Sequence, residues 1–131
     1  MPKTHPLPQP TTAELEILRV LWRRGAATVR EVHEELQPRR PVGYTTVLKL
    51  MQIMAEKGLV TRDQSARTHV YKAAVSGKST RRRLVSDLVD RAFDGSASGL
   101  VMQALSAGRA SAEEIERIRK LLDEMEKGGR S

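Results

Sequence analysis

The sequence predicts a mainly α-helical protein that carries one small β-hairpin. Apolar side chains recur every three or four residues in six stretches, the spacing that buries one face of a helix. Capping-box motifs open three of these stretches. Residues with β propensity gather in two short neighbouring segments, 59–62 and 68–72. We therefore expect three helices, a hairpin, and three further helices, in that order.

The first predicted helix follows a proline-rich stretch. Four of the six prolines lie in residues 1–10, where they disfavour helix, so we expect a disordered arm there. Thr11 and Glu14 then fit a capping box, in which the hydroxyl accepts from the Glu14 amide and the carboxylate reaches back. The helix should end near Gly25, since glycine is common just past a helix end.

A second helix, a basic turn and a third helix follow. Thr28 and Glu31 form another capping box, and Pro38 ends the short helix that it opens. Arg39 and Arg40 make the next turn basic. The helix expected over residues 44–57 has an apolar stripe of Val47, Leu50, Met51 and Met54. Its opposite face is mostly polar and is led by Thr45, Lys49, Gln52 and Glu56, with Thr46 on its flank.

The last three predicted helices are amphipathic and begin at Ser79. A third capping box, Ser111 with Glu114, opens the final one. Their apolar faces are too large to stay in water, yet they carry too few apolar residues for a core of their own, so we expect a second subunit to cover them. The residues predicted to form this dimer interface are Leu84, Leu88, Phe93, Leu100, Val101, Leu105, Ile115, Ile118 and Leu122.

Charge is distributed unevenly along the chain. The net charge is +7, but residues 1–78 hold 13 Lys and Arg against 7 Asp and Glu, whereas residues 84–131 hold 7 against 9. A basic first half favours a polyanionic partner. Nucleic acid fits this better than a membrane surface, because no basic amphipathic helix with large apolar residues stands out.

The order of the elements over residues 11–73 is that of a winged helix-turn-helix, whose third helix enters the major groove while the hairpin touches the DNA backbone. A recognition helix needs an apolar back, a front of short polar side chains and cations at its margins. We expect base or groove contacts from Tyr44, Thr45, Thr46, Lys49 and Gln52. We expect phosphate contacts from Arg39, Arg40, Arg62 and Arg67. For Tyr44, packing against the second helix is an equal alternative.

Four stretches of the sequence resemble the penicillinase repressor family of bacterial transcriptional regulators, of the BlaI and MecI type, with the related CopY copper repressors. These stretches are residues 12–22 (TAELEILRVLW), 44–51 (YTTVLKLM), 56–60 (EKGLV) and 67–71 (RTHVY). The resemblance extends over about residues 11–126. It implies a homodimer on a dyad-symmetric operator of double-stranded DNA, with a winged-helix DNA-binding domain at 11–78 and a helical dimerisation region at 79–131.

Two features of the sequence depart from the family pattern. The β-lactamase branch is cleaved at an Asn-Phe bond after a membrane sensor is triggered, and here Gln103-Ala104 aligns with that bond. The copper branch binds metal through a Cys-x-Cys pair, and this chain has no cysteine. Thiolate copper sensing is therefore excluded, cleavage at this bond is not supported, and a regulatory protease or sensor remains an open partner.

Other classes of function find little support in the sequence. Without cysteine there are no disulfides or thiolate zinc sites, and the three histidines lack metal-ligand spacing, so we expect no metal or cofactor. No nucleophile elbow or phosphate loop is present, which argues against an enzyme. No segment has the length of a signal peptide core or a membrane span, so we expect a cytoplasmic protein.

Two alternatives to a repressor stay open at this point. A winged-helix adaptor could use its basic face on an acidic protein, although exposed aromatic or large apolar anchors would then be expected on the face led by Thr45, Lys49 and Gln52. A non-specific architectural DNA-binding protein would need only the phosphate contacts.

Overall fold

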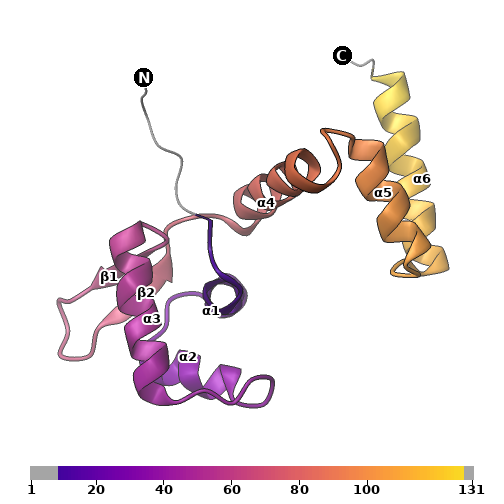
Figure 1. The fold of residues 1–131 in the computed structure, drawn as a ribbon. Helices are drawn as coiled ribbons and strands as arrows, with labels where there is room; N and C mark the ends of the chain where they lie inside the picture. Colours follow the sequence, from indigo (N-terminus) through magenta and orange to yellow (C-terminus); the bar gives the residue numbers. More distant parts are fainter. Residues whose placement is uncertain (1–8, 129–131) are drawn as a thin grey trace, which may run out of the picture. The chain divides into compact units, whose positions relative to one another are not determined.

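The computed structural model describes residues 9–128 of the chain, and most of the predicted arm, residues 1–8, lies outside the described residues. The chain divides into two compact units, one reaching Leu84 and the other beginning at Val85. Helix α4 (Gly77–Ala92) runs through this boundary (Figure 1). The first unit therefore extends beyond Lys78, the residue at which the sequence suggested a division.

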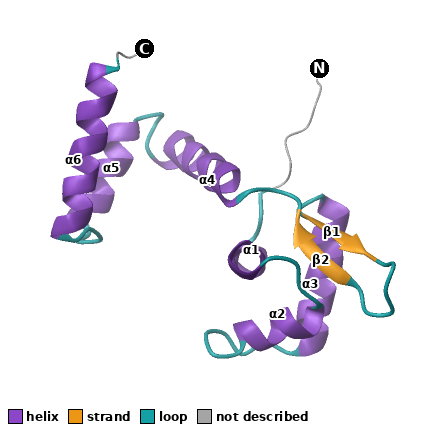
Figure 2. Ribbon diagram, turned by 180° about the vertical axis from the view of Figure 1, so that it is seen from behind, coloured by secondary structure: helices purple, strands orange, loops and turns teal. Residues whose placement is uncertain are grey.

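The first unit contains three helices and a hairpin. They are α1 (Thr12–Arg24), α2 (Val29–Leu36), α3 (Tyr44–Lys57), β1 (Val60–Asp63) and β2 (Val70–Ala73). The two strands pair antiparallel, with Val60 opposite Ala73 and Asp63 opposite Val70, and the hairpin lies beside α3 (Figure 2). The predicted fold class, mainly α with one small hairpin, is confirmed.

The capping boxes form as the sequence predicted. At α1, the Glu14 amide donates to the Thr11 hydroxyl over 3.2 Å, and the Thr11 amide donates to the Glu14 carboxylate over 3.0 Å. Thr28 and Glu31 make the same pair of bonds at α2. Each box satisfies two backbone donors that a helix start would otherwise leave unpaired.

The core of the first unit lies where the backs of α1, α2 and α3 meet the hairpin. Leu18, Val32 and Met51 are fully buried at apolar positions of the predicted helical spacing, and Ile17, which lies outside the predicted apolar stripe of α1, is buried with them. Tyr71 of β2 is also buried, and its backbone exchanges two hydrogen bonds of 2.8 Å with Ala27, which ties the segment between α1 and α2 to the hairpin.

The start of α4 belongs to the first unit. The Trp22 indole donates a 2.9 Å hydrogen bond to the Val75 carbonyl, and Thr80 is buried. We predicted that this helix begins at Ser79, but it begins at Gly77, because the Ser76 hydroxyl accepts from the Ser79 amide over 3.0 Å and caps it earlier.

The hairpin turn has no glycine or asparagine, and an aspartate takes their place. The Ser65 amide donates to the Asp63 carboxylate over 2.9 Å, which closes a side-chain turn at the end of β1. The pKa of Asp63 lies below its ordinary value, because Ser65 donates to the charged form from its hydroxyl and its amide. The strands begin one or two residues later than the predicted segments.

The second unit contains the end of α4 with α5 (Ala97–Ser106) and α6 (Ala112–Lys127). Ser111 and Glu114 form the third capping box at α6, as predicted. None of the described residues in α5 or α6 is buried. Large apolar side chains are instead exposed, among them Met102, Leu121, Leu122 and Met125. The described part of this unit, residues 85–128, therefore has helices but no core.

Candidate nucleic-acid interface

Helix α3 presents one face to the core and the other to solvent. Val47, Met51 and Met54 are completely buried and fix the back of the helix. The side chains predicted to contact bases are all exposed on the other face; they are Tyr44, Thr45, Thr46, Lys49 and Gln52. The exposed face is thus made of short or flexible polar groups, which is the arrangement that direct readout of base edges requires.

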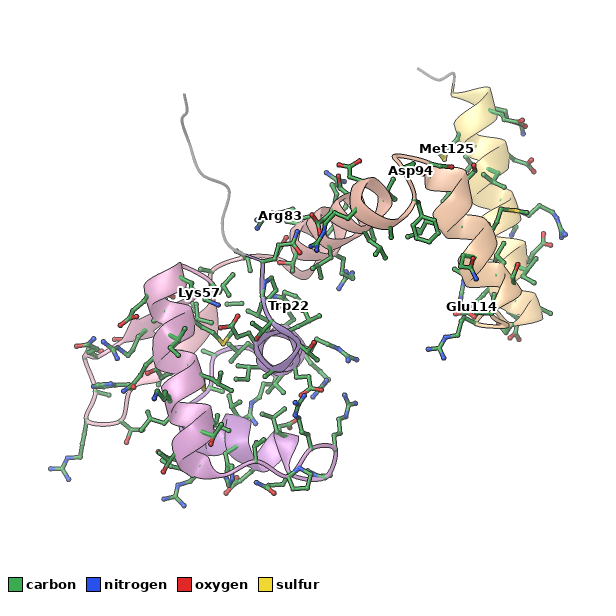
Figure 3. All side chains as sticks on the ribbon, viewed as in Figure 1. Trp22, Lys57, Arg83, Asp94, Glu114 and Met125 are labelled. Atoms are coloured by element: carbon green, nitrogen blue, oxygen red, sulfur yellow. The ribbon has the colours of Figure 1, made fainter. Side chains whose placement is uncertain are left out.

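One end of α3 is anchored by a buried carboxylate. The Lys57 ammonium lies 2.8 Å and 3.0 Å from the two oxygens of Glu14, whose side chain is only 2% exposed. Lys57 is in the last turn of α3 (Figure 3), and Gly58 ends the helix with a φ of 86°. The carboxylate that caps α1 therefore also orients the C-terminal end of α3, a pairing that the sequence spacing did not reveal.

Tyr44, at the other end of α3, packs against α2 and is also partly exposed. Its ring meets the His33 ring of α2 edge to face, with centroids 5.8 Å apart and planes at 81°. The side chain nevertheless stays 45% exposed and lines the groove described next. The packing on α2 holds the ring in place, so its outer edge is available to a ligand.

An open groove of about 540 Å³ separates α3 from the hairpin. Tyr44, Leu48 and Gln52, which lie one turn apart on α3, form one side of it, and Arg62 and Arg67 of the hairpin form the other. The remaining lining residues are Thr28, Val29, Arg30, Thr68, His69 and Tyr71. The structure thus brings together two of the predicted base contacts and two of the predicted phosphate contacts.

The other predicted site residues lie outside this groove. Thr45, Thr46 and Lys49 are exposed on α3 beside it. Arg39 and Arg40 follow α2 in the turn before α3, and Arg39 faces α1 in a small hollow that includes Glu16. Arg40 forms a 2.8 Å ion pair with that same glutamate. The basic turn is therefore engaged with α1 rather than with the groove.

Sequence reasoning missed two basic groups in the groove, Arg30 of α2 and His69 of the hairpin. Arg30 is exposed, and within residues 9–128 no carboxylate pairs with it. The available signal was its position two residues after the cap Thr28. This places it in the first turn of α2, but only the tertiary packing of α2 on α3 turns it toward the hairpin.

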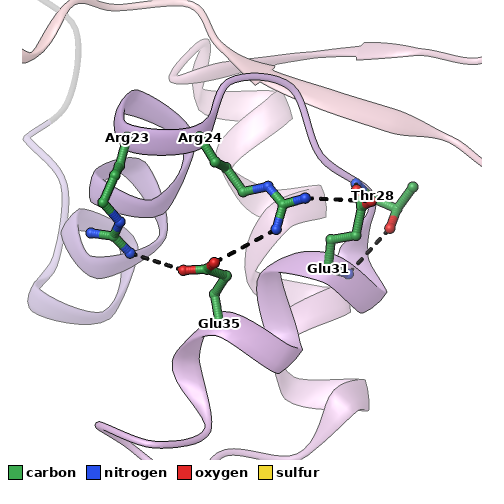
Figure 4. A network of polar contacts seen from close by, with 5 residues as sticks. All are labelled: Arg23, Arg24, Thr28, Glu31 and Glu35. Atoms are coloured by element: carbon green, nitrogen blue, oxygen red, sulfur yellow. Dashed lines mark hydrogen bonds and ion pairs between the residues drawn. The ribbon is translucent and has the colours of Figure 1, made fainter.

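A surface network occupies two further arginines (Figure 4). Arg23 lies 3.0 Å from Glu35, and Arg24 lies 3.4 Å from Glu31 and 3.7 Å from Glu35. The pKa of Glu31 is lowered, first by the hydrogen bond from the Thr28 amide and also by the charge of Arg24. These contacts join the end of α1 to α2, so the two arginines are balanced by acids, unlike those in the groove.

The residues predicted to form a dimer interface are largely uncovered. Leu88, Val101, Leu105, Ile115 and Leu122 are between 36% and 56% exposed. Leu84, Phe93, Leu100 and Ile118 are partly buried. Leu105, Ile118 and Leu121 line an apolar hollow between α5 and α6.

The part of the chain that the structure describes lacks two further features. Within residues 9–128, no three His, Asp or Glu side chains gather closely enough to hold a metal ion. No helix in the same range is long and apolar enough to cross a lipid bilayer.

Three helices, the third with a polar outer face, and a two-stranded wing define a winged helix-turn-helix protein. The sequence profile of the penicillinase repressor family matches residues 10–124. The transcriptional regulator BlaI of Mycobacterium tuberculosis is 39% identical over 119 residues, covering 88% of this chain and 83% of that protein. The chain therefore belongs to the penicillinase repressor family, a family of transcriptional repressors.

Two further comparisons agree with this assignment. The penicillinase repressor of Bacillus licheniformis is 24% identical over 118 residues, covering 90% of this chain and 92% of that protein. The solution structure of the DNA-binding domain of the repressor BlaI matches with a TM-score of 0.50 and 24% identity, covering 56% of this chain and 90% of that domain. The structural match supports the winged-helix fold.

Proposed function

We propose that this protein is a DNA-binding transcriptional repressor that acts as a homodimer on a dyad-symmetric operator. Each subunit inserts α3 into the major groove of one half-site and lays the hairpin on the adjacent backbone. Bound across a promoter, such a dimer excludes the transcription machinery. The proposal includes no catalytic activity and places the protein in the cytoplasm, where bacterial DNA is accessible.

The observation that carries the proposal is the composition of the surface around α3. Its outer face offers Thr45, Lys49 and Gln52 rather than apolar anchors, and the groove beside it gathers Arg30, Arg62 and Arg67. Cations that flank short polar groups suit a ligand with phosphates at its edges and hydrogen-bonding groups between them. An adaptor for an acidic protein would instead need exposed aromatic or large apolar anchors on this face.

The homodimer is supported by the second unit. The described part of α5 and α6 buries no side chain, although Leu105, Leu121 and Leu122 are large and apolar. Covering this area with a second copy removes it from water, which stabilises the dimer by about 25 cal/mol for each Å² of apolar surface buried. Two α3 helices held by one interface then read two half-sites related by a dyad, separated by about one helical turn or a multiple of it.

The signal that releases the repressor is left open in this proposal. Gln103 and Ala104, which align with the cleaved bond of the β-lactamase branch, are exposed within α5. A regulatory protease or sensor therefore remains a partner to be sought, and genes next to this one in the genome are the first place to look.

The decisive experiment is selection of bound sites from a random DNA library by the purified full-length protein at physiological salt. We expect an inverted repeat with a fixed spacing between half-sites. Enrichment of no sequence despite binding would contradict a repressor and favour an architectural protein. An absence of binding would favour the adaptor, which a search for protein partners would then test.

The salt dependence of operator binding checks the size of the interface. If each subunit neutralises about four or five phosphates, the plot of log K against log salt concentration has a slope of about −7 to −9. A slope near −2 would contradict the footprint that we propose.

A further inference from the structure

The groove between α3 and the hairpin has a specific place on bound DNA. If α3 occupies the major groove and the hairpin lies on the adjacent backbone, the sugar-phosphate strand at the edge of the major groove passes between them. The space between α3 and the hairpin is the 540 Å³ groove. This step rests on the function proposed above.

We propose that Arg30 of α2 closes this groove around the DNA backbone, together with Arg62 and Arg67 of the hairpin. Arg30 thereby takes the role in phosphate binding that the sequence suggested for Arg39 and Arg40 in the turn after α2. Arg30 belongs to α2, whereas all the DNA contacts predicted from the sequence lie on α3, the turn before it or the hairpin.

The surroundings of Arg30 support this role. The side chain is exposed in the first turn of α2 and lines the same groove as Arg62, Arg67 and His69. Arg30 also lines a second hollow, together with His33, Glu34 and Tyr44, so it lies near the N-terminal end of α3 as well as at the groove. Among residues 9–128 no acid pairs with Arg30, so its guanidinium need not give up an ion pair to bind a phosphate.

The surroundings of Arg39 and Arg40 in the basic turn argue against a phosphate contact equal to that of Arg30. Arg40 already pairs with Glu16 at 2.8 Å, and Arg39 lines a hollow with Glu16, Glu35 and Leu36 on the α1 side of α2. A phosphate contact by Arg40 would compete with that ion pair for its guanidinium.

The test compares three arginine-to-alanine variants of the full-length dimer, each of which removes one exposed cation per subunit. Arg30→Ala should make the salt slope less steep by about two, since two phosphates per dimer lose their contact. Arg40→Ala should leave the slope unchanged, as should Arg19→Ala, a matched control on the exposed side of α1. An unchanged slope for Arg30→Ala, or an equal loss for Arg40→Ala, would overturn the assignment.

A second measurement locates the contact and separates it from a change in folding. Single phosphates of the operator duplex are replaced in turn by uncharged methylphosphonates, and binding is measured for the wild type and for Arg30→Ala. We expect one phosphate in each half-site whose replacement weakens the wild type but not the variant, as in a double-mutant cycle. If every replacement weakens both proteins equally, Arg30 does not bind the backbone.

The slopes are also measured on a duplex of random sequence, because phosphate contacts do not depend on base sequence. A lack of sequence preference would overturn the repressor function, but the difference in salt slope between the wild type and Arg30→Ala would still test the phosphate contact. Conversely, if the wild type is sequence-selective and Arg30→Ala has the same salt slope as the wild type, only the role of Arg30 is overturned.

Discussion

The two units of this chain contain similar amphipathic helices, but only the first unit buries their apolar faces. In residues 9–84, the apolar faces of α1, α2 and α3 meet one another, so that Ile17, Leu18 and Met51 are fully buried. In residues 85–128, α5 and α6 carry capping residues and apolar faces of the same kind, yet nothing in them is buried. Amphipathic patterning therefore specifies that a face will be covered, but not whether the same chain covers it.

The largest expected effect comes from removing the uncovered unit. A fragment of residues 1–92 keeps every buried side chain of the core and should stay folded. We expect it to be monomeric and to bind the operator about 10²- to 10⁴-fold more weakly, because the second half-site is no longer bound intramolecularly. Sedimentation and operator titration measure both properties. A dimeric fragment would show that the interface lies in the first unit.

A pair of leucine truncations, one in each unit, sharpens the contrast in stability. Leu18→Ala should lower the free energy of unfolding of the first unit by about 2–5 kcal/mol at any protein concentration, since the cavity lies within one subunit. The effect of Leu122→Ala should depend on protein concentration, because in the proposed homodimer this side chain is covered by the second copy. Denaturant unfolding followed by fluorescence of Trp22, the single tryptophan, reports on the first unit, and circular dichroism reports on all helices. Equal, concentration-independent losses would contradict the comparison.

A third prediction concerns where sequence recognition lies. Lys49→Ala should weaken binding to the selected operator by about 1–3 kcal/mol and relax the preference at one or two base pairs, whereas Lys120→Ala on α6 should change neither. Both lysines are exposed, so the pair controls for net charge. Equal losses by Lys49→Ala on operator and random DNA would mean that this lysine contacts phosphate only.

The smallest expected effect is a pH dependence at the α2 cap. Because the folded state lowers the pKa of Glu31 below its ordinary 4.5, the ionised carboxylate stabilises the fold above that value, and this contribution disappears as the pH falls through the lower folded pKa. Glu31→Gln should therefore be less stable than the wild type near neutrality, and the gap should close in acid. The exposed Glu34→Gln variant is the control for charge on the same helix. A gap that stays constant with pH would show that the carboxylate charge contributes nothing.

Local signals were sufficient to predict most of the fold. The capping boxes at Thr11, Thr28 and Ser111 each involve only four consecutive residues, so the sequence alone identifies them. The apolar stripe through Val47, Met51 and Met54 determines which side of α3 is buried. The same stripe determines that Thr45, Lys49 and Gln52 are exposed. Local chemistry decides these features, so a single sequence contains them.

The features that escaped prediction depend on residues far apart in the chain. The Glu14–Lys57 pair spans 43 positions, and the bond from Trp22 to the Val75 carbonyl spans 53. Arg30 reaches the groove only because α2 crosses α3 near the hairpin. The position just before the third helix favoured Arg39 and Arg40 in the sequence, whereas only the packed structure places Arg30 at the groove.

The anchoring of α3 at one end has a consequence for how this protein can change its target. Lys57, Gly58 and the buried methionines hold the back and the C-terminal end of the helix, whereas Thr45, Lys49 and Gln52 support no packing in the core. Exchanges among those outer positions would leave the scaffold intact, so new operators are within reach of a few substitutions. Evolution and protein engineering can therefore redirect such a regulator without first rebuilding it.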